Sequence, residues 1–159
     1  MSKQKKMSKT SLSESTRNPA NRRLSITPWK PTILVAEDSA DAREMMQVLL
    51  RSRGYNVVAA DNGIHALEVA VKNEPDAVLL DLQLPIMDGL SVTRSLRLHP
   101  ALKTVPIIII SGQDPDPYRQ RAIDAGSDEY LLKPIDFDHL QSLLDRFVPR
   151  ERRAHVKFA

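Results

Sequence analysis

Three acidic residues, one serine and one lysine stand where apolar runs of this 159-residue chain end. Side chains of these types are the ones that hold a hard cation and handle a phosphoryl group. Each has an ordinary explanation when taken alone, as a helix cap, a strand-end hydroxyl or a solvated lysine. A shared site is therefore predicted only if the fold brings the five together. In chain order they are Glu37, Asp38, Asp81, Ser111 and Lys133.

Together these side chains predict phosphoryl transfer onto a carboxylate. Clustered carboxylates repel one another, and a hard divalent cation such as Mg²⁺ relieves that repulsion. Asp81, alone at the end of its apolar run, is the candidate nucleophile that would form an aspartyl-phosphate. The cation would neutralise the phosphoryl oxygens during transfer, while Lys133 and Ser111 would bind those oxygens through an ammonium and a hydroxyl.

The elements that would position these groups alternate regularly along the chain. Five short apolar runs are expected to form strands, at 32–36, 55–60, 76–81, 105–111 and 129–133. Stretches with apolar residues at helical spacing follow them, at 41–53, 63–73, 89–98, 116–125 and 137–147. This alternation predicts an α/β fold with a five-stranded parallel sheet and right-handed crossovers. The uninterrupted apolar run VPIIIIS (105–111) predicts that helices cover both faces of the sheet.

An open parallel α/β sheet binds its ligands beyond the carboxyl ends of its strands. Every candidate group closes or directly follows a predicted strand, so we expect all five at one edge of the sheet. Asp38 or Ser39 can also cap the helix that follows, and Asp88 is expected to structure its own turn. The four histidines show no spacing typical of metal ligands.

Four segments of the chain resemble the receiver domains of two-component response regulators. They are VAEDS (35–39), LLDLQLPIMDG (79–89), IIIISG (107–112) and EYLLKPI (129–135), and the resemblance extends over about residues 32–148. The motifs are jointly specific, because an acidic pair, an Asp, a Ser and a Lys-Pro pair follow in the family's order at the right strand ends. The resemblance implies a flavodoxin-like receiver fold with strand order 2-1-3-4-5, an order that flavodoxin-like proteins share.

The resemblance also implies a role for individual residues. Asp81 would be the phosphoacceptor, with Lys133 and Ser111 as its catalytic partners. Ser111 and Tyr130 would form the switch that responds to phosphorylation, and a cis peptide is implied between Lys133 and Pro134. The implied ligands of Mg²⁺ are Glu37 (mostly through bound water), Asp38, Asp81 and the backbone carbonyl of Gln83.

Basic tails flank an acidic middle. Residues 1–31 hold eight Lys or Arg and one Glu, residues 150–159 hold four and one, and the stretch between holds 11 basic and 18 acidic residues. Few large apolar side chains occur in 1–31, which predicts a disordered N-terminal tail. Residues 32–148 would form the receiver domain, and 149–159 a short basic C-terminal tail. A solubilising role for the tails is favoured over contact with nucleic acid or an anionic membrane, since no interleaved aromatics support base stacking.

Composition excludes several classes of protein. The chain has no cysteine, which excludes disulfides, thiolate metal sites and cysteine nucleophiles. No apolar run approaches the roughly 18 residues of a membrane span, and no signal-peptide core follows the basic N-terminus. We therefore expect a cytoplasmic protein.

These inferences predict a single-domain response regulator, since about ten residues follow 148 and are too few for an output domain. It would receive its phosphoryl group from a histidine kinase or a histidine phosphotransferase. A downstream protein would bind the face formed by the helix 116–125, the strand 129–133 and the last helix, and a homodimer is left open. The chain would catalyse only its own phosphorylation and dephosphorylation, so it is not expected to be an enzyme in the metabolic sense.

Two alternatives come from other classes. A phosphatase resembling the haloacid dehalogenases would use the same group types, but it needs its nucleophile on the first strand in a D-x-D pattern, and Asp38 is followed by Ser39 and Ala40. Sustained turnover of small phosphomonoesters would favour it. A nucleic-acid adaptor would use the receiver only for dimerisation, and deletion of residues 1–31 would then remove salt-dependent DNA binding.

Overall fold

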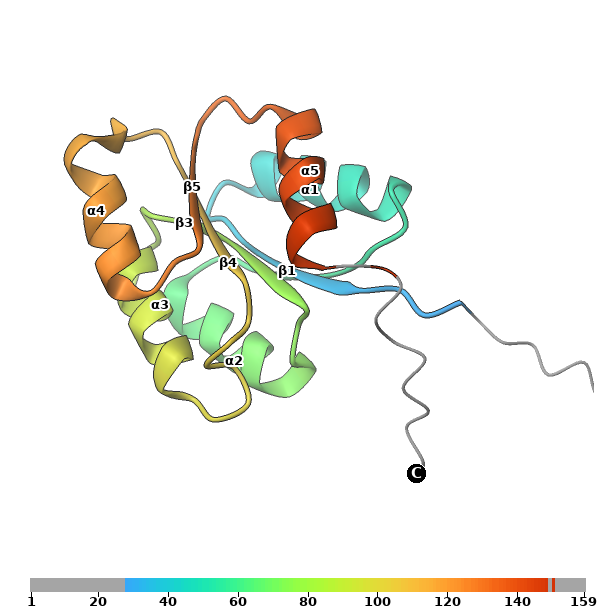
Figure 1. Cartoon of the computed structure of the whole chain (residues 1–159), viewed down its shortest axis with the longest axis horizontal. Helices are drawn as coiled ribbons and strands as arrows, with labels where there is room; N and C mark the ends of the chain where they lie inside the picture. Colours follow the sequence, from blue (N-terminus) through green and yellow to red (C-terminus); the bar gives the residue numbers. More distant parts are fainter. Residues whose placement is uncertain (1–27, 149, 151–159) are drawn as a thin grey trace, which may run out of the picture.

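Five strands and five helices alternate along the part of the chain that the computed structural model describes, residues 28–148 and 150 (Figure 1). The strands are β1 (Thr32–Ala36), β2 (Asn56–Ala60), β3 (Ala77–Asp81), β4 (Ile107–Ser111) and β5 (Glu129–Leu132). The helices are α1 (Ala40–Ser52), α2 (Gly63–Asn73), α3 (Gly89–Leu98), α4 (Pro115–Ala125) and α5 (Phe137–Phe147). Apart from residues 28–31 and 150, the two predicted tails lie outside the described residues.

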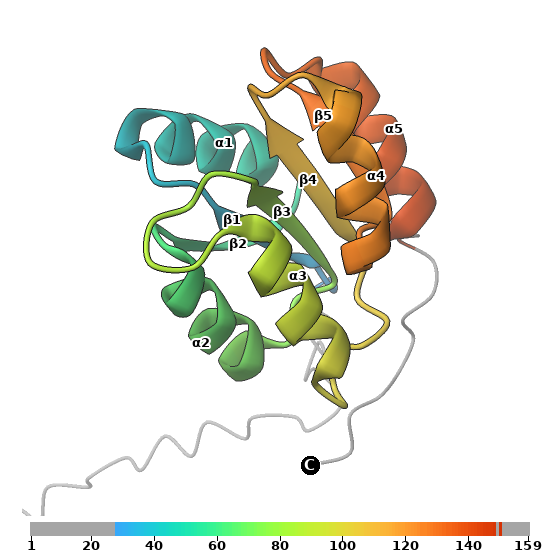
Figure 2. The same ribbon diagram turned by 90° about the vertical axis from the view of Figure 1, so that its left-hand side faces the viewer.

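All five strands are parallel and follow the order β2-β1-β3-β4-β5, as predicted. Helices α1 and α5 cover one face of this sheet, while α2, α3 and α4 cover the other (Figures 1 and 2). The predicted α/β fold with helices on both faces is therefore confirmed. Among the described residues, no helix combines the length and the apolar character needed to cross a bilayer.

The two faces explain why β4 is apolar along its whole length. Ile107 and Ile109 pack into the cluster formed with α2, α3 and α4, while Ile108 and Ile110 pack into the cluster formed with α1 and α5. None of the four is more than 4% exposed. Successive side chains of a strand point to opposite faces, so a strand covered on both sides has no position for a polar residue until it ends.

Helix starts are set by short polar side chains. The Oγ of Ser39 accepts a hydrogen bond from the backbone N–H of Ala42 (3.4 Å) and caps α1. Asp88 caps α3 through the N–H of Ser91 (2.8 Å), so it structures its turn as predicted. Since Ser39 caps α1, capping does not account for the acidic side chain of Asp38.

Most element boundaries lie within one residue of the predictions, and the starts of β4 and α4 differ for identifiable reasons. The strand expected from residue 105 begins at Ile107, because the carbonyl of Val105 accepts from the guanidinium of Arg97 (2.7 Å) and its N–H donates within the preceding loop. In α4, Asp116 has non-helical backbone angles (φ −89°, ψ 116°), so regular helix begins at Pro117. Both the Asp116–Pro117 and the Lys133–Pro134 peptides are cis, and only the second was expected.

Candidate functional site

The pairing of the strands sets their carboxyl ends level with one another. The paired residues at these ends are Ala36 with Leu80, Asp81 with Ile110, and Ser111 with Leu132. Glu37 therefore follows β1 beside Asp81, and Lys133 follows β5 beside Ser111. The predicted gathering of polar groups at one edge results directly from this pairing, since each group closes or follows its strand.

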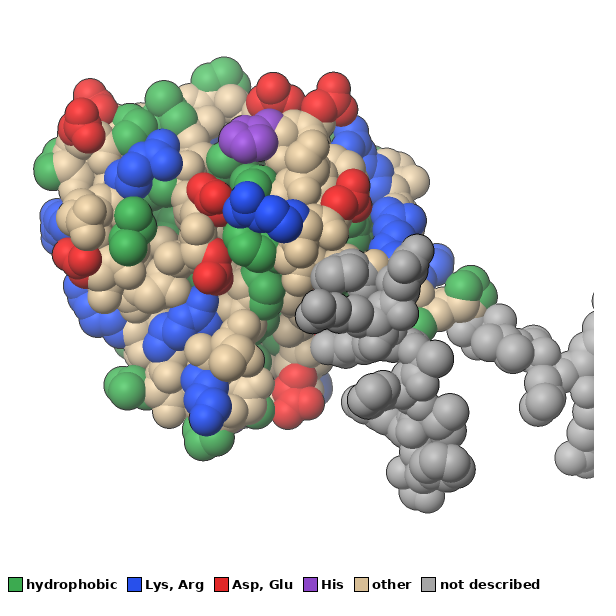
Figure 3. Space-filling view, viewed as in Figure 1, with side chains coloured by type: hydrophobic (Ala, Val, Ile, Leu, Met, Phe, Trp, Pro, Cys, Tyr) green, Lys and Arg blue, Asp and Glu red, His purple; other side chains and the backbone are tan. Residues whose placement is uncertain are grey.

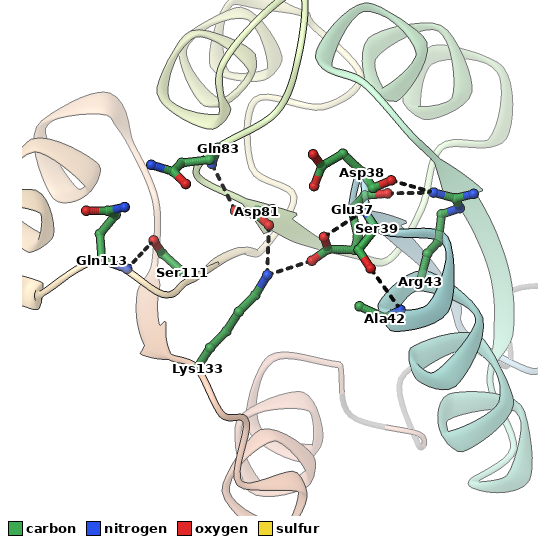
Figure 4. A network of polar contacts seen from close by, with 10 residues as sticks. All are labelled: Glu37, Asp38, Ser39, Ala42, Arg43, Asp81, Gln83, Ser111, Gln113 and Lys133. Atoms are coloured by element: carbon green, nitrogen blue, oxygen red, sulfur yellow. Dashed lines mark hydrogen bonds and ion pairs between the residues drawn. The ribbon is translucent and has the colours of Figure 1, made fainter.

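The ammonium of Lys133 bridges two of the predicted carboxylates. Its Nζ lies 2.8 Å from Oε2 of Glu37 and 2.8 Å from Oδ2 of Asp81 (Figure 4). Glu37 and Asp81 are each 8% exposed, so both charges are largely withdrawn from solvent. The lysine joins groups that are 96 and 52 positions away in sequence.

The surroundings of Lys133 favour its charged form. Burial by itself would lower the pKa of its ammonium, but hydrogen bonds to Asp81 and Glu37 and the negative charges of both outweigh burial and raise the pKa above its ordinary value of 10.5. Lys133 therefore carries its positive charge at neutral pH.

The three carboxylates form a cluster that could hold a cation. Glu37, Asp38 and Asp81 each offer an oxygen within 4.8 Å of the others. Lys133 balances one of the three negative charges, which leaves a surplus of negative charge at an all-oxygen donor set. Oxygen donors with this charge suit Mg²⁺, which takes one or two carboxylates and completes an octahedron with water. The donor set thus fits the predicted ion.

The loop after β3 wraps closely around Asp81. The N–H of Gln83 donates to Oδ1 of Asp81 (2.9 Å), and the N–H of Gly89 donates to the carbonyl of Leu82 (2.9 Å). A Cβ at Gly89 would clash with the carbonyl oxygen of Asp81, so only glycine permits this approach. Gln83 is thereby placed at the site, and its carbonyl remains a predicted metal ligand.

Ser111 and Tyr130 contact the backbone of the same residue, Gln113, in the loop after β4. The Oγ of Ser111 accepts from the N–H of Gln113 (3.0 Å), and the hydroxyl of Tyr130 donates to the carbonyl of Gln113 (3.0 Å). Ser111 is fully buried and Tyr130 is 3% exposed. The two predicted switch residues are therefore linked through Gln113, whereas no hydrogen bond joins Ser111 to Asp81 within the described part of the chain.

Sequence reasoning missed two residues of this arrangement, Gln113 and Arg43. The Nη1 of Arg43 donates to the carbonyl of Glu37 (2.9 Å) and more weakly to that of Asp38 (3.5 Å) (Figure 4). Arg43 contacts the backbone carbonyls of other residues, and Gln113 takes part through its own backbone N–H and carbonyl, so neither contact can be read from residue type. Only their positions in the sequence could have indicated them. Gln113 lies two residues after Ser111, and Arg43 lies about one helical turn after the acidic pair.

A cavity of about 250 Å³ borders the carboxylate of Asp81, between α1 and the segment that follows β5. Its lining combines the charged residues Glu37, Asp81 and Lys133 with apolar side chains. The larger apolar members are Met45, Met46, Leu79, Ile110, Ile135 and Phe137. Asp81 thus lines a mostly apolar cavity and also belongs to the acidic cluster.

Comparison with known proteins agrees with this geometry. Residues 33–145 match the family model described as "Response regulator receiver domain". The chain is 38% identical over 123 residues to "Response regulator MprA" of Mycobacterium sp. (strain KMS), covering 75% of this chain and 53% of that protein. It is 36% identical over 105 residues to "Transcriptional regulatory protein PrrA" of Mycobacterium tuberculosis, and the match covers 66% of this chain and 44% of that protein. The chain thus spans about half the length of the curated relatives it matches.

Solved structures share the fold over nearly their whole length. The chemotaxis protein CheY4 of Vibrio cholerae superposes with a TM-score of 0.72 at 27% identity, covering 76% of this chain and all of that one. The receiver domain of the sensor histidine kinase PA1611 from Pseudomonas aeruginosa gives 0.70 at 34% identity, covering 75% and 98%, and is described with a magnesium ion coordinated in its active-site cleft. With its sheet order, its acidic edge and this match over most of its length, the chain belongs to the response regulator receiver domain family.

Proposed function

We propose that this receiver domain accepts a phosphoryl group on Asp81 from a phosphorylated histidine of a histidine kinase or a histidine phosphotransferase. The observation that carries the proposal is the bridge from Lys133 to Glu37 and Asp81, because it gathers an acceptor, a cation and a metal-binding acid at one strand edge. A scaffold role alone would not need a surplus of buried carboxylate charge.

In the proposed transfer a carboxylate oxygen of Asp81 attacks the phosphorus of the donor. The new bond is the O–P bond, the P–N bond to the donor imidazole breaks, and the electron pair of that bond stays on the imidazole nitrogen. Lys133, already 2.8 Å from the acceptor carboxylate, is placed to bind a phosphoryl oxygen. Ser111 would donate its hydroxyl hydrogen to another phosphoryl oxygen, and movement of its Oγ toward that oxygen would break the bond that it accepts from Gln113.

A magnesium ion would be held by Asp38, Asp81 and the carbonyl of Gln83, with Glu37 acting mainly through bound water. When bound, it would neutralise charge on the phosphoryl oxygens. Support comes from the oxygen-only donor set within 4.8 Å and from the relative described with magnesium.

Phosphorylation would reach a protein partner through the backbone of Gln113. When Ser111 releases the N–H of Gln113, the carbonyl that accepts from Tyr130 belongs to a loop with one fewer restraint. Such a loop has two arrangements that a phosphoryl group can bias.

The partner face we propose is formed by α4, β5 and α5, toward which Figure 3 looks. Apolar side chains lie there among acidic and basic ones, and Ile123 and Leu132 are 52% and 48% exposed. A surface in which apolar contacts are ringed by charge suits a reversible protein contact. A second copy of the chain could use the same face.

We further propose that the protein is cytoplasmic, acts as a single domain, and turns over only its own phosphoryl group. The curated relatives are about twice as long as the matched segment, so the length of the natural protein tests the single-domain proposal. Steady hydrolysis of small phosphomonoesters would argue for the phosphatase alternative.

Phosphorylation by acetyl phosphate with Mg²⁺ tests the central proposal. Wild type, Asp81→Asn and the matched control Asp88→Asn are compared by intact-protein mass, since Asp88 is an acidic residue of the same loop that caps α3. The phosphoryl adduct is expected in wild type and in the control, to fall to background in Asp81→Asn, and to need added Mg²⁺. An adduct that persists in Asp81→Asn at the wild-type level would mean that another residue is the acceptor.

A further inference from the structure

Arg43 contacts the backbone that carries the acidic pair. It lies near the start of α1, is half-buried, and directs its guanidinium back toward the end of β1 (Figure 4). Nη1 is 2.9 Å from the carbonyl oxygen of Glu37 and 3.5 Å from that of Asp38. The contact is with main-chain atoms, so the carboxylates themselves keep their lone pairs for other partners.

Glu37 is held at several points, and Arg43 supplies one that no other contact replaces. Its N–H donates to the carbonyl of Ala60 (3.1 Å), and its carboxylate accepts from Ser39 and Lys133. Arg43 adds the bond to its carbonyl. For Asp38 the side chain is exposed, and the described hydrogen bonds include a single donor to its backbone carbonyl, the same guanidinium.

We propose that Arg43 is a positioning residue for the cation site. It restrains the turn between β1 and α1 so that Glu37 and Asp38 present their carboxylates toward Asp81. This inference rests on the proposed function, because it assigns Arg43 to the magnesium site postulated there. Arg43 does not touch the reacting atoms, and its effect would pass through the backbone of the acidic pair.

Charge and positioning predict effects of opposite sign, which makes the proposal testable. A positive guanidinium near a dication repels it, so removing the charge would tighten binding by roughly two- to five-fold on electrostatic grounds. Removing a partner that orients metal ligands typically weakens metal binding by roughly 10- to 100-fold. If Arg43 positions the turn, the second effect exceeds the first, and loss of the guanidinium weakens binding despite the lost repulsion.

The experiment measures Mg²⁺ affinity of the full chain by calorimetric titration. Arg43→Gln removes both the charge and the paired donors, while Arg43→Lys keeps the charge but cannot reproduce the guanidinium geometry. Arg51→Gln is the matched control, because it removes an equal charge from the last turn of the same helix, where Arg51 donates to Gln47. Thermal unfolding without Mg²⁺ verifies that each variant is folded at the titration temperature.

We expect Arg43→Gln to weaken Mg²⁺ binding by about ten-fold or more. Arg43→Lys should weaken it by several-fold, and Arg51→Gln should stay within two-fold of wild type. Calcium supplies a second readout, since Ca²⁺ tolerates flexible geometry and Mg²⁺ demands a near-ideal octahedron. The ratio of Mg²⁺ to Ca²⁺ affinity should therefore fall in both Arg43 variants.

Tighter Mg²⁺ binding by Arg43→Gln, with Arg43→Lys unchanged, would show that only charge matters and would overturn the proposal. Equal losses for both ions would overturn it as well, since loss of geometry must affect Mg²⁺ more. If Arg43→Gln fails to fold, Arg43→Lys alone decides by the same criteria. If wild type itself binds no Mg²⁺ at millimolar concentration, the metal site of the proposed function fails, and this result is distinct from unchanged binding in the variants.

Discussion

Two charged clusters lie at opposite ends of the same parallel sheet, and their charges are balanced differently. At the amino ends of β4 and β5, Arg97 donates to the carbonyls of Gly126 (2.8 Å) and Val105 (2.7 Å) and pairs with Asp128 (3.0 Å). At the carboxyl ends, Lys133 pairs with two carboxylates, those of Glu37 and Asp81, and the carboxylate of Asp38 lies in the same cluster. In the first cluster the charge of Arg97 is balanced by the single carboxylate of Asp128, and its other N–H groups donate to loop carbonyls. The second keeps a surplus of negative charge.

The difference separates scaffold from site. A cluster whose donors and acceptors are matched gains nothing from a ligand and contributes to stability. A cluster with unbalanced buried charge gives up stability and gains affinity for what balances it, as sites commonly do. The comparison predicts that changes at the carboxyl edge alter function and that changes at the amino edge alter stability.

Lys133→Met should give the largest effect. Loss of the ammonium removes the cation placed to bind a phosphoryl oxygen, so the rate of Asp81 phosphorylation by acetyl phosphate should fall by about 10²-fold. The initial rate of adduct formation measures it. A rate within a factor of three of wild type would remove Lys133 from the proposed machinery.

Arg97→Met should lower the stability of the fold and leave the phosphorylation rate nearly unchanged. The guanidinium bridges the loop after α3 to the loop after α4 and is 21% exposed. Its loss leaves several carbonyls without their donor and removes the cation that pairs with Asp128, whose carboxylate still accepts from the N–H of Ile107. We expect the free energy of unfolding to fall by about 2–3 kcal/mol, with little change in phosphorylation rate below the unfolding transition. Urea unfolding measures the first quantity.

Arg146→Met is the control for Arg97→Met. The Arg146 side chain also pairs with a carboxylate, that of Glu129 (2.9 Å), but it is 60% exposed. Its loss should cost less than about 0.5 kcal/mol. If both substitutions lower the free energy of unfolding equally, the proposed contrast between the half-buried contacts of Arg97 and the exposed ion pair of Arg146 is wrong.

Tyr130→Phe tests the region between the clusters. The change removes the hydroxyl that donates to Gln113 and keeps the buried ring, so unfolding should cost about 1 kcal/mol less. Phosphorylation should proceed, while binding of a partner at the α4–β5–α5 face should respond less to it. Unaltered coupling in this variant would assign the switch to other residues.

Alkaline pH should give the smallest effect. The pKa of Lys133 is raised in the folded chain, so its ion pairs contribute their full stability below pH 10.5 and lose it as the pH rises through the folded value. Since the side chain is 32% exposed, the change is at most about 0.5 kcal/mol. The difference in unfolding free energy between wild type and Lys133→Met should narrow above pH 10.5. A constant difference would indicate a loss of packing rather than of charge.

The fold and the polar edge could be predicted because both follow from periodicity. Apolar runs that end in Glu37, Asp81, Ser111 and Lys133 mark strand ends, and parallel strands bring their ends to one edge. Arg43 and Gln113 could not be predicted in this way, since Arg43 contacts backbone carbonyls and Gln113 acts through its own backbone, and the positions of these groups depend on turn geometry. The start of β4 was misplaced for the same reason, because Arg97 withdraws the carbonyl of Val105 from the strand.

The four isoleucines of β4 have a consequence for how the strand finds its partners. A slip of two residues would bury the same side chains on the same faces, so apolar burial alone barely distinguishes the native alignment from its neighbours. A pair of hydrogen bonds at the amino end of the strand distinguishes the native alignment. Oδ2 of Asp128 accepts from the N–H of Ile107 (2.8 Å), and the N–H of Asp128 donates to the Ile107 carbonyl (2.8 Å). These two hydrogen bonds fix the position of Ile107, the first residue of the strand. They thereby place Ser111, and not an isoleucine shifted by two residues, at the carboxyl end of β4, near Asp81.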